Sequence, residues 1–113
     1  MSELADQHCV PCEGGISPLT REEAERYLNK IAPDWTLSDD AKIISREFKF
    51  KGFYKTIAFV NALAWMANNE GHHPDLEVSW GRCLVNWSTH AIGGLSENDF
   101  ICAAKTDRIH DNK

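Results

Sequence analysis

Three of the five histidines occupy two short segments of the chain, and imidazole is the side chain best suited to proton transfer near neutral pH. His72 and His73 are adjacent, and His90 follows later. If they meet, one imidazole could donate a proton while another accepts one, as an acid–base elimination requires. Three imidazoles are also a ligand set for catalytic zinc, and histidines can simply cap or solvate a surface. All three interpretations stay open from the residue types alone.

Alternating apolar and polar residues predict two strands between these histidines. The alternation covers residues 76–80 and residues 83–87, with Gly81 and Arg82 between them. Two residues are enough for a tight hairpin loop, so the two segments are predicted to pair as antiparallel strands.

The register of this hairpin predicts where the histidines lie. With Gly81 and Arg82 as the loop, Trp80 pairs with Cys83 and continuation of the pairing brings His73 opposite His90. Directly opposed residues have Cβ atoms about 4.5–5.5 Å apart. His72 is the neighbour on the preceding turn, so the three imidazoles are predicted to converge at one end of the hairpin.

Helical patterns predict the remaining elements. Thr20 and Glu23 form a capping box that opens a helix over about residues 21–30. The longest helix covers about residues 53–69, where five apolar residues fall on one stripe: Phe53, Ile57, Val60, Ala64 and Ala67. Ser96 and Asp99 repeat the capping pattern before a last helix that reaches about residue 108, so Asp99 is interpreted as a helix-start residue.

A further hairpin around Ser38 to Asp40 completes the order α-β-β-α-β-β-α. Antiparallel hairpins separated by helices predict an α+β fold, an antiparallel four-stranded sheet with helices packed on one face. Residues 20–113 are predicted to form this single domain. Residues 1–19 lack periodicity and contain Gly14, Gly15 and Pro18, so they are interpreted as an N-terminal arm.

The arm carries a C-x-x-C motif, Cys9 and Cys12, directly after His8. This spacing suits half of a zinc site or a redox pair, but a second pair and a βαβ context are missing. A mobile or interface-packed arm is the simpler interpretation. Cys83 and Cys102 fall within a strand and a helix pattern and are predicted to be small core residues.

Composition and charge exclude several function classes. The 113 residues carry a formal net charge of −5, which disfavours a phosphate backbone as the partner. We find neither a secretory signal pattern at the amino terminus nor an apolar run of membrane-spanning length. These observations predict a cytoplasmic protein that binds neither nucleic acid nor membranes directly.

The histidine segments resemble a known family, the pterin-4a-carbinolamine dehydratases, over about residues 20–104. The resemblance rests on residues 70–75, which read Glu-Gly-His-His-Pro-Asp, and on Trp80, Ser88, Thr89, His90, Gly94, Leu95 and Asp99. Trp35 and the spacing of Phe48, Phe50 and Phe53 also fit. The chain departs from the family at Asn68, a position that is often charged there.

The resemblance implies a metal-free dehydratase without a redox cofactor. Its reaction would convert a 4a-hydroxytetrahydropterin into a quinonoid dihydropterin and water during tetrahydrobiopterin recycling. The catalytic residues would be His72 and His90 as general acid and base, with His73 holding the pterin. The substrate-binding residues would also include Gly71, Ser88, Thr89 and Ala91.

The family also predicts a homodimer or homotetramer. It contains members that act as dimerisation or transcriptional coactivator proteins, and relatives with assembly roles. A non-catalytic interaction protein of the same fold is therefore the alternative function. Retention of His72, His73 and His90 favours the enzyme, because a binding protein has no physical need to keep three imidazoles together.

Overall fold

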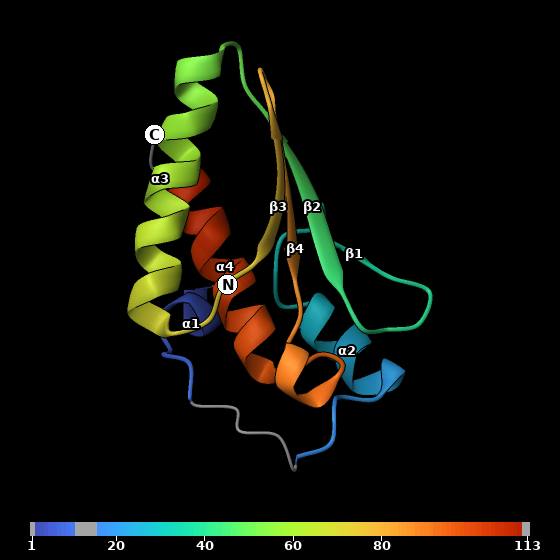
Figure 1. The fold of residues 1–113 in the computed structure, drawn as a ribbon. Helices are drawn as coiled ribbons and strands as arrows, with labels where there is room; N and C mark the ends of the chain where they lie inside the picture. The colour runs from blue at the N-terminus through green and yellow to red at the C-terminus, as the bar shows by residue number, and fades with distance from the viewer. Residues whose placement is uncertain (1, 11–15, 112–113) are drawn as a thin grey trace.

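One antiparallel sheet with helices packed against one of its faces forms the fold, as the sequence predicts (Figure 1). The computed structural model describes residues 2–10 and 16–111. The elements in chain order are α1 (Ser2–Ala5), α2 (Arg21–Leu28), β1 (Thr36–Leu37), β2 (Ile44–Lys49), α3 (Phe53–Glu70), β3 (Asp75–Ser79), β4 (Arg82–Trp87), the 3-10 turn η1 (His90–Ile92) and α4 (Glu97–Asp111).

The sheet has the order β1-β2-β4-β3, so the two predicted hairpins lie side by side with β4 between β2 and β3. Alternation on β4 gives the sheet one apolar face, because Cys83, Val85 and Trp87 are fully buried. Helices α3 and α4 cover that face (Figure 1). The other face is polar, where Arg82 forms ion pairs with Glu47 of β2 and Glu77 of β3.

The predicted register of the β3–β4 hairpin is wrong. The structure pairs Ser79 with Arg82, so Trp80 and Gly81 form the loop and Trp80 is exposed. Two distant groups fix this loop: the Phe50 amide donates to the Gly81 carbonyl at 2.8 Å, and the Thr56 hydroxyl donates to the Trp80 carbonyl at 2.9 Å. The local sequence of the hairpin contains neither contact.

Helix α3 buries only part of the predicted stripe: Ala67 is buried and Ile57 and Val60 are partly buried, but Phe53 and Ala64 are exposed. Phe53 is 58% exposed, whereas the buried residues are Thr56, Phe59, Leu63, Met66 and Ala67. The helix is apolar on adjacent faces, so periodicity alone did not distinguish them. The helix ends were nevertheless predicted to within about one residue.

The described part of the N-terminal arm packs against α4. Helix α1, which the sequence analysis did not predict, buries Leu4 and Ala5, and Lys105 donates to the Ala5 carbonyl at 2.9 Å. Cys9 Sγ lies 3.4 Å from the Sγ of Cys102, and this contact together with burial raises the pKa of the Cys102 thiol.

Two of the cysteines lie in the core of the fold. Cys83 and Cys102 are fully buried, as predicted, and burial raises the pKa of Cys83 to about 11. Cys12 lies outside the described residues. Within residues 2–10 and 16–111, no three His, Cys, Asp or Glu side chains are arranged to hold a metal ion. None of the helices described in these ranges is long and apolar enough to cross a membrane.

Candidate functional site

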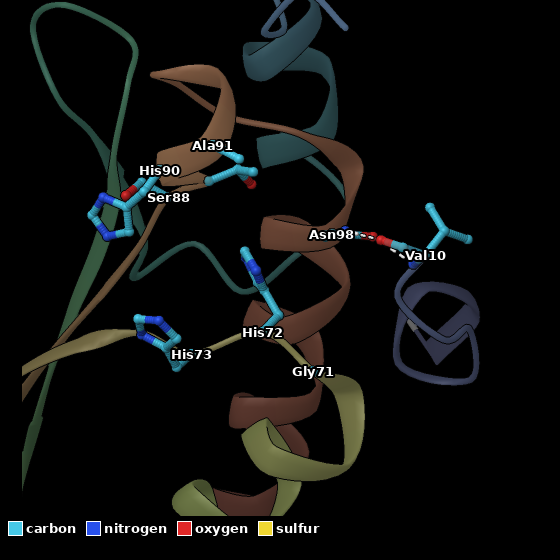
Figure 2. A pocket seen from close by; sticks show the side chains of 9 residues that line it. Val10, Gly71, His72, His73, Ser88, His90, Ala91 and Asn98 are labelled. Carbon is cyan, nitrogen blue, oxygen red and sulfur yellow. Dashed lines mark hydrogen bonds between the residues drawn. The ribbon is translucent and has the colours of Figure 1, made fainter. Parts of the chain in front are cut away.

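A cavity of about 180 Å³ brings together all the predicted site residues (Figure 2). It lies where α3 leads into β3 and β4 leads into η1. Its lining contains two residues that the sequence analysis did not predict, Val10 of the arm and Asn98 of α4. The predicted residues in the lining are Gly71, His72, His73, Ser88, Thr89, His90 and Ala91.

Glycines in the left-handed conformation place the histidines at the cavity. Gly71 caps α3 with φ 66° and turns the chain out of the helix immediately before His72. Gly93 ends η1 with φ 68° and lets the chain return, so that the Thr89 amide donates to the Gly94 carbonyl at 2.8 Å. The two turns carry His72 and His90 to the same end of the sheet.

His72 is the most firmly held of the three imidazoles. Its Nε2 lies 2.6 Å from the Oδ1 of Asp99, and its ring stacks on Trp87 with centroids 5.4 Å apart. The His72 side chain is only 13% exposed. Because Nε2 is engaged by the carboxylate, Nδ1 is the ring nitrogen left for a ligand.

Asp99 does more than start a helix. Its Oδ2 accepts from the Ser96 amide at 2.9 Å, the capping bond that the sequence predicts, and also from the Thr89 hydroxyl at 2.7 Å. Its other oxygen holds His72, and the residue is fully buried. The interpretation of Asp99 as a helix-start residue alone was therefore incomplete, because a capping pattern contains no information on the second oxygen.

His73 and His90 form a separate pair on the open side of the cavity. Their rings stack with centroids 6.2 Å apart and an interplanar angle of 26°. His90 Nε2 lies 3.5 Å from the Oδ2 of Asp75. The two rings approach although the predicted register is wrong, because both lie beyond the paired strand residues, where the turns set their positions.

Other aromatic and polar residues of the sequence analysis lie elsewhere. Trp35 is buried in the core, with its Nε1 donating to Asp107 at 2.9 Å, and does not line the cavity. Asn68 lines an adjoining apolar cavity of about 460 Å³, which shares Gly71, His72 and His73 with the first.

The comparison with family models decides the family. Residues 17–109 match the model of pterin 4 alpha carbinolamine dehydratase. The chain belongs to this family. It is therefore a member of a dehydratase family, a class of lyases, and pterin is the family's substrate class.

Curated relatives agree over almost the whole chain. A provisionally named pterin-4-alpha-carbinolamine dehydratase of Nitrosomonas eutropha is 56% identical over 95% of this chain and 93% of its own. Another from Legionella pneumophila (strain Corby) is 50% identical over 96% of each chain.

Two solved structures share the fold. A transcriptional coactivator/pterin dehydratase from Brucella melitensis superposes with a TM-score of 0.77 at 31% identity, covering 82% of this chain and 98% of its own. A pterin dehydratase-like protein described as a RuBisCO assembly factor in the alpha-carboxysome has a TM-score of 0.59 at 21% identity, over 67% of this chain and 88% of its own. The second shows likeness of fold alone.

Proposed function

We propose that this protein removes water from a 4a-hydroxytetrahydropterin by histidine acid–base catalysis. The observation that carries the proposal is the cavity in which three imidazoles meet, one of them fixed by a buried carboxylate. The cavity suits one small ring-shaped ligand. Imidazoles on two sides of it can act as the proton donor and the proton acceptor.

The reaction requires two proton transfers. The C4a–O bond breaks and the departing hydroxide takes a proton, while the N5 proton leaves so that a C4a–N5 double bond forms. His72 and His90 supply the acid and the base, and His73 binds the ring. Asp99 fixes the orientation of His72. The rest of the cavity around the pterin ring is lined by Gly71, Ser88, Thr89 and Ala91.

The biological setting belongs to the same proposal. A dehydrated quinonoid pterin is the form that a reductase can return to the tetrahydro state, so we place the enzyme in tetrahydrobiopterin recycling in the cytoplasm. We also propose a homodimer or homotetramer, with the pterin as its small-molecule partner.

Turnover of a 4a-hydroxytetrahydropterin by the purified protein, with and without a chelator, tests the function. We expect turnover that a chelator does not change. His72→Ala and His90→Ala should each lower kcat by about 10²–10⁴-fold, the usual range for one acid or base. His73→Ala should chiefly raise KM. Asn61→Ala, at an exposed site on α3 away from the cavity, provides the control.

Three results would overturn this proposal. Chelator-sensitive turnover would favour a zinc enzyme, and unchanged kinetics in all three variants would remove the site. Absence of turnover in a correctly folded protein would favour the alternative, a non-catalytic coactivator or assembly protein of the same fold.

A further inference from the structure

We infer that Val10 of the N-terminal arm is part of the pterin site, and that Asn98 is the positioning residue that holds it there. The inference rests on the proposed function and adds a substrate-positioning segment to it. Val10 and Asn98 line the same cavity as the three histidines. Figure 2 shows them on one side of His72, with His73 and His90 on the other.

Asn98 holds the main chain of Val10 through both of its amide atoms. The Val10 amide donates to Asn98 Oδ1 at 3.1 Å, and Asn98 Nδ2 donates to the Val10 carbonyl at 2.6 Å. Asn98 is buried, whereas Val10 is 66% exposed and its side chain points away from the histidines in Figure 2. The arm therefore contributes its backbone to this end of the cavity.

A second group of contacts holds the arm immediately before Val10. The Cys9 amide donates to Glu70 Oε1 at 2.8 Å, and Glu70 Oε2 lies 3.1 Å from His8 Nδ1 and 3.4 Å from Lys105 Nζ. The Glu70 side chain is 7% exposed. In the sequence, Glu70 directly precedes the turn that carries His72. The arm and His72 are thus fixed from the same end of α3.

The comparisons place this segment outside the part that the whole family shares. The match to the family model begins at residue 17. Similarly, 82% of this chain is enough to cover 98% of the Brucella melitensis structure. The Nitrosomonas eutropha relative instead covers 95% of this chain and so extends into the arm. The arm is an addition to the family fold that reaches the shared histidine cavity.

The chemistry of the two residues limits what they can do. Neither Val10 nor Asn98 has a group that titrates near neutral pH, so neither can transfer the protons of the dehydration. They can exclude water and fix the ligand. Loss of the arm contact should therefore act on substrate binding and leave the proton-transfer step to the histidines.

The test removes the contact from each side. Asn98→Ala deletes both hydrogen bonds, and Val10→Pro deletes the one donated by the arm without changing α4. We expect KM for the 4a-hydroxytetrahydropterin to rise roughly tenfold in Asn98→Ala and less in Val10→Pro, as the loss of two and of one hydrogen bond implies. The kcat should stay within about twofold, and the pH profile of kcat should not move. Asn61→Ala, at an exposed site on α3, is the control.

Direct binding separates this inference from the proposed function. A 7,8-dihydropterin, followed by fluorescence, should bind the wild type and bind Asn98→Ala roughly tenfold more weakly. If the wild type neither binds nor turns over a pterin, the proposed function fails, and this inference fails with it. If the wild type is active but KM and dihydropterin affinity are unchanged in the variants, the inference alone is overturned.

Two further outcomes of the Asn98→Ala experiment have a defined meaning. A lower kcat with a shifted pH profile would show that Asn98 acts on His72 through its neighbour Asp99, which also overturns the inference. If circular dichroism shows that Asn98→Ala does not fold, Val10→Pro decides, because it changes an exposed residue of the arm.

Discussion

The two sides of the histidine cavity differ in how firmly the protein holds its imidazoles. On the inner side, His72 is 13% exposed, bonds to a fully buried carboxylate and stacks on a fully buried tryptophan. On the outer side, the His90 side chain is 63% exposed, and its acidic neighbour, Asp75, is 65% exposed. The same residue type therefore occurs in one cavity in two very different settings.

The difference separates a preorganised group from an adjustable one. A hydrogen bond between a buried carboxylate and an imidazole contributes about 1.5–3 kcal/mol, whereas an exposed ion pair contributes about 0–1 kcal/mol. His72 is thus held in place before a ligand arrives, while His90 and His73 can adjust to one. Substitutions on the two sides should differ in size accordingly.

Asp99→Ala should have the largest effect, because Asp99 orients the inner imidazole. We expect kcat to fall by about 10²-fold or more, and the free energy of unfolding to fall by about 2–4 kcal/mol, since the Thr89 hydroxyl and the Ser96 amide lose their buried partner. Steady-state kinetics and thermal unfolding measure the two effects.

Asp99→Asn helps to separate orientation from stability, because it keeps the shape of the side chain and can keep one accepting oxygen. It should regain part of the stability while kcat stays low. Asp111→Ala, at the exposed end of the same helix, is the control. Wild-type kcat in a folded Asp99→Ala protein would contradict the preorganised role of the inner side.

Glu70→Gln should have a smaller, pH-dependent effect on the same inner side. Burial alone would raise the pKa of Glu70, but the Cys9 amide, His8 and Lys105 outweigh it and hold the pKa below its usual value of 4.5. The carboxylate therefore stabilises the fold above about pH 4.5, and this contribution is lost as the pH falls through the lowered pKa.

Urea unfolding at several pH values measures this contribution. At pH 7, Glu70→Gln should lower the free energy of unfolding by about 1–2 kcal/mol, and the difference from wild type should shrink toward pH 3. Glu77→Gln, which changes an exposed carboxylate on β3, is the control for the loss of a charge. A difference that is constant with pH would show that the charge of Glu70 is not what anchors the arm.

Local patterns predicted helices α2, α3 and α4 and the four strands, because capping and periodicity are properties of neighbouring residues. The capping box at Thr20 and the glycine at position 71 mark real helix ends. The hairpin register could not be predicted, since Phe50 and Thr56 fix its loop from other elements. His110, near the end of α4, likewise packs through a contact between distant elements: the centroids of its ring and of the Phe48 ring in the core are 5.0 Å apart.

The site shows the same limit. The three histidines were predicted to meet from the hairpin pattern, and the residues beside them from the resemblance to a family. The structure brings both groups to one cavity. Val10 and Asn98 were missed because a turn-rich arm gives no local signal of where it packs. The role of Asp99 toward His72 was missed because the two residues meet only after α3 and α4 have packed.

Asp75→Asn should have the smallest effect, because it removes the acidic neighbour of His90 on the outer side. The carboxylate lies 3.5 Å from His90 Nε2 and both side chains are exposed, so solvent and salt screen their attraction. We expect kcat and KM to change by about twofold or less, and that change to vanish in 0.5–1 M salt, where the Debye length is only about 3–4 Å. The same Asp-to-Asn change at position 99 is the direct comparison, measured under identical conditions. A loss of activity at Asp75 as large as that at Asp99, at low and high salt alike, would mean that the outer imidazole is as firmly oriented as the inner one, and the distinction between the two sides would have to be abandoned.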